Sequence, residues 1–245
     1  MVLIVGCGRT GTNMLLEMLR GSSFLHATAV TEHKTVFKNC PELPSEYLSK
    51  CDTVYIPNLK KVDDLILKNR NVKILFTIRD FRDCVLSKIY RGQPGQDGNI
   101  ELADDATPDG CVMDIRWADK IYEYIKFKYP QNIMLVKMED VILNTEKTLS
   151  NVCDFCNIPY EKVKMLKFTS RYRNQDKSSR YKSLDKSQVG LHTRIKEIYD
   201  GFYRDFAENI YPIYQHLGDL LFKHGYVTQD EFEKDYGNFI VGRKK

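Results

Sequence analysis

The stretch that decides the fold opens the chain: Val2-Leu3-Ile4-Val5 runs directly into Gly6-Cys7-Gly8-Arg9-Thr10-Gly11-Thr12-Asn13. Consecutive apolar, mostly β-branched residues predict a strand that is buried on both faces. The glycines after it permit a sharp turn in which backbone N–H groups point at one spot. From Thr12 to Leu19 the apolar residues recur on one face of a helix. A strand, a glycine-rich turn and a helix N-terminus in this order form an arrangement that binds phosphate groups.

This glycine loop departs from the Walker A pattern of Gly, four residues, Gly, then Lys and Ser or Thr. Gly6 and Gly11 have the required separation, but Thr12-Asn13 stands where Lys and Ser or Thr are needed. The Lys that would reach a γ-phosphate is therefore missing. The loop instead contains a cation of its own, Arg9, followed by the hydroxyl residues Thr10 and Thr12. A plain strand-to-helix turn is the alternative interpretation of such a loop taken alone.

A second strand followed by a helix supports the anion-binding interpretation. Residues 72–78 predict another buried strand, and a helix is expected from about Phe81. Arg79 would then lie at the carboxyl end of the strand and Ser87 within the helix, where both side chains can bracket another anion. Ligands of open α/β sheets bind at the carboxyl ends of the strands, so both motifs are expected at one edge. Taken alone, the charges of residues 79–83 also fit a solvated, self-paired run.

These motifs resemble the nucleotide signatures of sulfotransferases that use 3′-phosphoadenosine 5′-phosphosulfate (PAPS). Gly-x-x-Arg-Thr-Gly-Thr is similar to that family's 5′-phosphosulfate loop, with Arg9 in the place of Lys or Arg. Ile-Arg-Asp-x-Arg-Asp-x-x-x-Ser is similar to its 3′-phosphate site, in which Arg79 and Ser87 would bind the phosphate. A third match, residues 135–159, resembles the family's strand, Glu-Asp-Leu and helix ending in Phe-Leu-Gly-Ile-Pro. The resemblance covers roughly residues 2 to 160.

The resemblance implies the residues that would hold PAPS and its product 3′-phosphoadenosine 5′-phosphate (PAP). These are Gly8, Arg9, Thr10, Gly11, Thr12 and Asn13 of the loop, with Arg79 and Ser87 for the 3′-phosphate. Arg9 would also be catalytic, because charge builds on the leaving oxygen that it faces.

The general base is expected at the end of the second strand. In the branches of the family that use a carboxylate base, a Glu follows the loop's Arg at about the spacing that separates Arg9 from Glu32. The cytosolic aryl and steroid branch uses a His, and Asn58 stands in the matching place. Asn58 takes no proton at neutral pH, which leaves Glu32 first and His33 second. An exposed strand end is the alternative interpretation of both.

Composition places the chain among ordinary globular proteins. Its 245 residues are 42% hydrophobic and 29% charged, which suits a single domain over residues 1–245. The net charge of +4 suits an anionic ligand but lacks the concentrated basic stripe expected for nucleic acid. No apolar run is long enough to span a membrane, and a core strand beginning at residue 2 leaves no room for a signal peptide.

The cysteines argue for a reducing compartment. Seven cysteines in no regular spacing indicate free thiols and a cytoplasmic location. Cys153 and Cys156 form a C-x-x-C motif, but both would face the core of an amphipathic helix, which favours packing over redox chemistry or zinc.

The remaining elements alternate between strand and helix. Strands are predicted near residues 24–30, 53–56 and 133–136, and helices over 59–69, 111–129, 145–156 and 195–221, with a short last helix over 230–236. Residues 92–110 and 169–190 read as loops, and in the family such loops lie over the acceptor and the nucleotide. The expected fold class is α/β, with a mainly parallel sheet of four to five strands, the P-loop NTPase-like sulfotransferase fold and a helical C-terminal part.

The predicted function is transfer of a sulfuryl group from PAPS to an acceptor hydroxyl, without a metal. The acceptor is a small molecule, glycan, lipid or peptide, since the fold does not select among these. Two alternatives stay open. One is a Mg²⁺-dependent P-loop kinase that uses Asp80 or Asp83 as a metal ligand, and the other is a nucleotide-binding module without catalysis. The oligomeric state does not follow from the sequence.

Overall fold

The computed structural model describes residues 1–27, 33–89, 108–168 and 207–231, without the side chains of 86–89, 108, 109 and 207–214. The chain divides into two compact units: Met1–Arg79 with Trp117–Asp185, and Asp80–Arg116 with Lys186–Lys245. The predicted loops over 92–110 and 169–190 fall largely or wholly outside the described residues, and so does most of the helix predicted over 230–236. No helix within the described ranges is long and apolar enough to cross a membrane.

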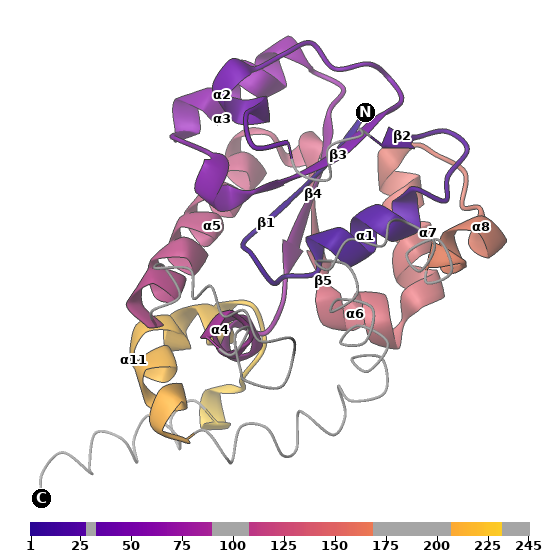
Figure 1. The fold of residues 1–245 in the computed structure, drawn as a ribbon. Helices are drawn as coiled ribbons and strands as arrows, with labels where there is room; N and C mark the ends of the chain where they lie inside the picture. Colours follow the sequence, from indigo (N-terminus) through magenta and orange to yellow (C-terminus); the bar gives the residue numbers. More distant parts are fainter. Residues whose placement is uncertain (28–32, 90–107, 169–206, 232–245) are drawn as a thin grey trace, which may run out of the picture. The chain divides into compact units, whose positions relative to one another are not determined.

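The first unit is built on a parallel sheet of five strands (Figure 1). The strands are β1 (Val2–Gly6), β2 (His26–Ala27), β3 (Tyr47–Asp52), β4 (Lys73–Ile78) and β5 (Ile133–Lys137), in the order β2-β3-β1-β4-β5. The chain extends the sheet first on one side of β1 and then on the other, which makes the carboxyl end of β1 a topological switch point. The predicted α/β class with a mainly parallel sheet is confirmed.

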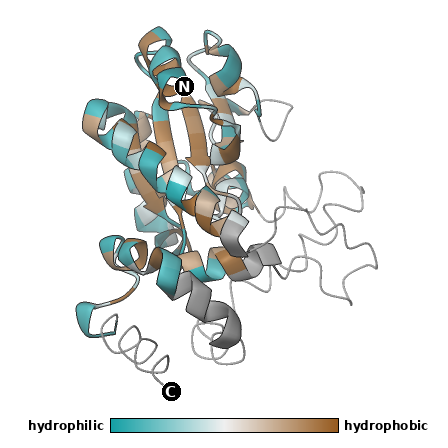
Figure 2. Ribbon diagram, turned by 90° about the vertical axis from the view of Figure 1, so that its left-hand side faces the viewer, coloured by the Kyte–Doolittle hydropathy of each residue, from teal (hydrophilic) through white to brown (hydrophobic). Residues whose placement is uncertain are grey.

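Helices cover both faces of this sheet, and Figure 2 shows its hydrophobic strands between them. One face packs against α1 (Thr12–Leu19), α6 (Met138–Leu143), α7 (Thr145–Cys156) and α8 (Lys162–Leu166). On the other face, the Phe76 ring of β4 lies 5.4 Å from the ring of Tyr122 on α5 (Pro108–Lys128). Every residue of β1 is buried, as expected of a central parallel strand. The short α2 (Val36–Asn39) and α3 (Leu59–Lys68) connect β2, β3 and β4.

The second unit contains α4 (Phe81–Ile89) and α11 (Ala207–Lys223), the described portion of the helical C-terminal part. The ring of Phe81 packs edge-on against His224 at 5.6 Å and Tyr226 at 5.7 Å. Arg116, at the end of this unit's share of α5, donates hydrogen bonds to the Asp219 carboxylate at 2.8 and 3.1 Å.

Two predicted boundaries are wrong for identifiable reasons. The third strand is Tyr47–Asp52, whereas Thr53–Tyr55 forms a 3-10 helix. The residues after Asp52 are mostly β-branched or aromatic, a composition typical of a strand. The real strand contains two polar residues, Ser49 and Lys50, which are buried and break the apolar pattern. The helix predicted from Cys111 begins at Pro108, since Pro is favoured in the first turn of a helix.

The cysteines pack as core residues. All seven are free and buried. Burial raises the pKa of Cys153 to about 11 and that of Cys156 to about 12, so both thiols are protonated at neutral pH. The Cys153 thiol lies 3.7 Å from the sulfur of Met165. This pair therefore serves packing, as the sequence indicates.

A hydrogen-bond cluster around Asp63 joins α3 to α5. The Asp63 carboxylate accepts from Lys128 Nζ at 2.7 Å, from the Tyr124 hydroxyl at 2.8 Å and from the Tyr129 hydroxyl at 2.9 Å. Burial alone would raise the pKa of Asp63, but these three donors outweigh it and hold that pKa below its ordinary value. The ionised carboxylate is thus the form that the fold favours.

Asp63→Asn should lower the free energy of unfolding at pH 7 by about 1–3 kcal/mol, because Lys128 and the two tyrosine hydroxyls lose a charged acceptor. Urea denaturation measures the loss. Since folding lowers the Asp63 pKa, its stabilisation is present above the unfolded-state pKa of about 4 and disappears as the pH falls below it. The difference between wild type and Asp63→Asn should shrink accordingly in acid.

Asp64→Asn is the matched control. Asp64 lies next to Asp63 but forms only a surface ion pair, 3.3 Å from Lys61 Nζ. Its loss should change stability by less than about 0.5 kcal/mol. Equal effects of the two substitutions would show that the Asp63 cluster does not join the helices.

Candidate functional site

The loop between β1 and α1 is held in an unusual backbone conformation. Arg9 has φ 77° and Gly11 has φ 84°, both in the left-handed region. Glycine adopts this region freely, whereas a residue with a Cβ does so at a cost of roughly 1–2 kcal/mol. Left-handed residues within a turn direct successive N–H groups to one side and create a concavity for anions. Strained residues of this kind cluster at functional sites.

A pair of hydroxyls fixes the loop to the sheet. Thr10 Oγ1 donates to the carbonyl oxygen of Cys7 at 2.6 Å and lies 2.9 Å from Thr77 Oγ1 on β4. Gly6 lies beneath this contact, and a Cβ there would come 2.2 Å from Thr77 Oγ1 and 2.6 Å from Thr10 Oγ1. The Thr10 side chain is 1% exposed, so its hydroxyl shapes the loop from inside the protein.

The N-terminus of α1 opens from this loop. Gly11 is the N-cap of the helix, and no side chain caps it. Gly8, Arg9, Thr12 and Asn13 are half-buried, so the N–H groups of the first turn face a site that a ligand can reach. Met138, the first residue of α6, supports the turn from behind, since a Cβ on Gly11 would come 2.1 Å from its sulfur.

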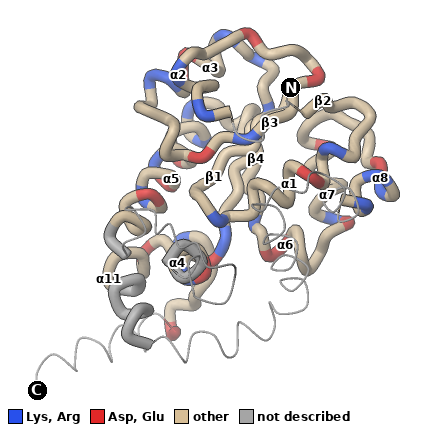
Figure 3. Tube along the Cα trace, in the orientation of Figure 1, with Lys and Arg blue, Asp and Glu red and all other residues tan. Residues whose placement is uncertain are grey.

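Arg79 joins the loop at the same edge. It directly follows β4, whose Thr77 pairs in register with Gly6, so Arg9 and Arg79 both follow strands that end side by side. Figure 3 shows basic positions on the segments after β1 and β4. Ser87 belongs to the second unit and its side chain is outside the described part, so its pairing with Arg79 stays a prediction.

The charges that follow Arg79 form a buried ion pair. Asp80 is 0% exposed and accepts from Arg82 Nη2 at 2.6 Å and from Arg82 Nε and backbone N–H at 2.9 Å. These two residues are thus paired with each other, as the alternative interpretation expects, but the pair is buried and not solvated. Asp80 directly precedes α4, and its hydrogen bond from the Arg82 backbone N–H caps the start of that helix. Among the described residues, no group of three or more His, Cys, Asp or Glu side chains could hold a metal ion.

Of the two candidates for the general base, the structure describes only His33. Glu32 lies outside the described residues. His33 donates its backbone N–H to Lys50 at 2.8 Å, and its Nδ1 lies 2.5 Å from the Tyr47 hydroxyl. Burial lowers the pKa of His33, so its imidazole is neutral at pH 7. Asn58 has a structural role, because its side chain caps α3 by accepting from the Lys61 N–H at 3.0 Å.

The sequence did not single out three residues of this edge. Thr77 is a polar residue within an otherwise apolar strand, which is a recognisable signal. Met138 carries no signal that separates it from any core residue. Asp52, the last residue of β3, pairs in register with Gly6. Because the sequence predicts this strand near residues 53–56, it does not place Asp52 at the carboxyl end of the strand.

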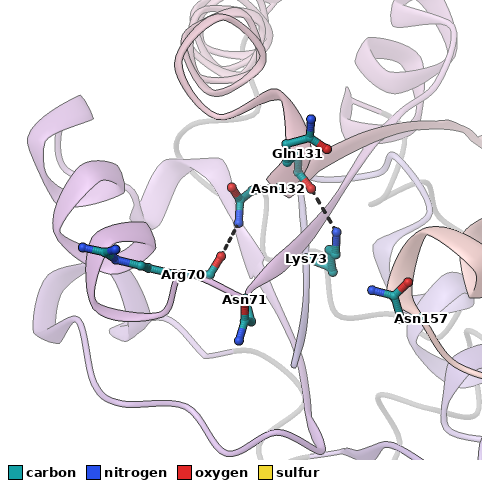
Figure 4. A pocket seen from close by; sticks show the side chains of 6 residues that line it. All are labelled: Arg70, Asn71, Lys73, Gln131, Asn132 and Asn157. Carbon is teal, nitrogen blue, oxygen red and sulfur yellow. Dashed lines mark hydrogen bonds between the residues drawn. The ribbon is translucent and has the colours of Figure 1, made fainter.

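A separate hollow lies at the opposite edge of the sheet, at the amino ends of β4 and β5 (Figure 4). It has a volume of about 250 Å³ and is lined by Arg70, Asn71, Lys73, Gln131, Asn132 and Asn157. Lys73 Nζ donates to the carbonyl oxygen of Gln131 at 3.0 Å, and the Asn132 amide donates to that of Arg70 at 2.9 Å. These polar groups hydrogen-bond to one another. The hollow lies at the opposite edge of the sheet from the loop between β1 and α1.

Comparison with known proteins places the chain in a family. The family model of the sulfotransferase domain matches residues 1–215, and the chain belongs to this family. A similar solved structure is the sulfotransferase domain from the curacin biosynthetic pathway, with TM-score 0.52 and 16% identity over 68% of this chain and 76% of that one. Another is mouse sulfotransferase SULT7A1 complexed with PAP, with TM-score 0.50 and 18% identity over 71% and 66%. No curated protein sequence matches the chain significantly.

The left-handed conformation of Arg9 gives a prediction on stability. Arg9→Gly should be more stable than Arg9→Ala by about 1 kcal/mol, because both remove the guanidinium but only Gly relieves the Cβ strain. Urea denaturation of the two variants measures the difference. An Arg9→Ala variant at least as stable as Arg9→Gly would show that the loop relaxes and holds no strain.

Proposed function

We propose that the protein transfers the sulfuryl group of PAPS to an acceptor hydroxyl and releases PAP. The observation that carries the proposal is the loop after β1, with left-handed Arg9 and Gly11 leading into the uncapped N-terminus of α1. This is an anion site with one cation inside it. A relative of the same fold was solved with PAP, which supports the same nucleotide here.

In the proposed reaction the acceptor oxygen attacks sulfur in line with the bond to the 5′-phosphate. The S–O bond breaks and its electron pair stays on the phosphate oxygen, where negative charge builds as in phosphoryl transfer. Arg9, Thr12 and the N–H groups of the loop, apart from that of Thr10, which donates to the Cys7 carbonyl oxygen at 3.3 Å, would stabilise that charge. One donor of this kind is worth about 10²–10³ in rate. The reaction needs no metal, because a sulfuryl group carries less charge than a phosphoryl group.

The acceptor hydroxyl must also lose its proton, a step for which a general base contributes roughly 10²–10⁴ in rate. Glu32 is the first candidate from the sequence and His33 the second. His33 would accept a proton at Nε2 only in the tautomer whose Nδ1–H donates to the Tyr47 hydroxyl. If Tyr47 donates instead, Nε2 carries the hydrogen and His33 is no base.

The rival functions make different demands on this edge. A kinase would need Mg²⁺, yet Asp80 is engaged by Arg82 in a buried pair. A nucleotide-binding module without catalysis would bind PAP and transfer nothing. The small net charge favours neither function and gives no reason to propose nucleic acid as a partner. Free thiols throughout the chain support a cytoplasmic location as part of the proposal.

The direct test incubates the protein with radiolabelled PAPS and a mixed metabolite extract, and identifies what becomes labelled. Label on a small-molecule, glycan, lipid or peptide hydroxyl would establish the reaction and the acceptor class. PAP binding without any labelled product would favour the binding module, and Mg²⁺-dependent ATP turnover would favour the kinase.

Arg79 should distinguish PAP from adenosine 5′-phosphate. Its contact with the 3′-phosphate is worth about 1.5–3 kcal/mol, so Arg79→Ala should weaken PAP binding by roughly 10- to 150-fold and leave adenosine 5′-phosphate nearly unaffected. Calorimetric titration of both nucleotides measures the ratio. An unchanged ratio in the variant would remove Arg79, and Ser87 with it, from the 3′-phosphate site.

Arg9 should matter more for turnover than for binding of PAP. Its interaction strengthens as the leaving oxygen gains charge, so Arg9→Ala should lower turnover by about 10²-fold or more and weaken PAP binding far less. Label transfer and PAP titration are compared on the same preparation. Turnover equal to wild type would reduce Arg9 to a surface residue of the turn.

A further inference from the structure

Asp52 lies beside the phosphate loop, on the strand next to β1. It is the last residue of β3 and pairs in register with Gly6, the last residue of β1. Neighbouring strands lie about 4.8 Å apart, so the backbone of Asp52 borders the residue from which the loop starts. A side chain that follows a parallel strand at a switch point is placed to meet a ligand.

The sheet also puts Asp52 on the same face as α1. Leu48 packs in the core cluster that contains α1, and side chains of a strand alternate between faces, so Leu48 and Asp52 share this face. Ile4 and Gly6 of β1 share it by the same argument. Gly6 is thus flanked by Thr77 of β4, whose hydroxyl contacts that of Thr10, and on its other side by Asp52 of β3.

Local hydrogen bonds hold the carboxylate at the end of the strand. Asp52 Oδ1 accepts from the Val54 N–H at 3.2 Å and lies 3.5 Å from Thr53 Oγ1, and it thereby caps the 3-10 helix that follows. The side chain therefore turns forward past the end of the strand. It is half-buried, which leaves it within reach of a ligand at this edge.

His33 is held differently. Its imidazole contacts Tyr47, which lies at the amino end of β3, opposite to Asp52. Of the acidic and imidazole groups that the structure describes on β3 and its flanking segments, Asp52 has the register position beside the loop. A fixed carboxylate at that position is a candidate for the general base.

We propose that Asp52 is the general base of the sulfuryl transfer, an assignment that rests on the function proposed above. The acceptor O–H gives its proton to the Asp52 carboxylate as the acceptor oxygen bonds to sulfur. The bond from sulfur to the 5′-phosphate oxygen breaks, and PAP leaves with that electron pair. Asp52 then releases the proton to solvent.

The test uses Asp52→Asn, since Asn caps a helix as well as Asp and keeps the local fold. Label transfer from PAPS into the mixed metabolite extract should fall by about 10²-fold or more, while PAP affinity stays within roughly twofold of wild type. Glu32→Gln and His33→Ala, at the two other candidates for the base, are measured alongside. Asp64→Asn, which removes a carboxylate from the surface of α3, should match wild type.

The outcomes separate this assignment from the function on which it rests. Normal transfer by Asp52→Asn overturns the assignment alone, and so does a loss confined to Glu32→Gln or His33→Ala. Loss of PAP binding together with transfer in Asp52→Asn also overturns it, because the residue would then support the loop. A wild-type protein that neither binds PAP nor transfers label overturns the proposed function itself.

Discussion

The contact between Thr10 and Thr77 across Gly6 is the constraint on which the candidate site depends. The two hydroxyls lie 2.9 Å apart in the buried interior, and only a residue without a side chain fits beneath them. The contact ties the loop to β4, which is the neighbour of β1 because the connection from β3 to β4, which contains α3, crosses over β1. The strand order, the glycine and the two threonines therefore determine together where the loop turns and where α1 begins.

The loop keeps a strained Arg at a position where Gly would be easier. Arg9 and Gly11 adopt left-handed conformations on either side of Thr10, a turn geometry typical of anion-binding loops, and α1 adds the N–H groups of its uncapped first turn. Because the Thr10 side chain is buried, Arg9 supplies the charge and Thr10 supplies the shape. These are separate contributions, which is why the Gly and Ala variants of Arg9 can tell strain from charge.

The sequence predicts the elements that have a clear apolar pattern and fails where polar residues are buried. The helix from Thr12 to Leu19 has the predicted bounds, although it is buried at six consecutive positions, Glu17 included, and not on one face alone. β3 was missed because Lys50, only 8% exposed, interrupts the apolar pattern that marks a buried strand. A strand predicted after Asp52 puts the carboxyl end of the strand in the wrong place, so spacing alone favours Glu32, His33 and the position of Asn58 for the base, and not Asp52. A search by spacing cannot find a residue whose importance comes from its register with Gly6.

The proposal of sulfuryl over phosphoryl transfer rests on how much charge this edge can hold. A triphosphate is held by the Walker Lys and by Mg²⁺ together, whereas this loop has Thr12-Asn13 in that place and Arg82 occupies the Asp80 carboxylate. Arg9 lies within the loop after β1, and Arg79 directly follows the neighbouring strand β4. Two separated cations suit a donor whose two anionic groups are also separated, a phosphosulfate at one end of a ribose and a single phosphate at another.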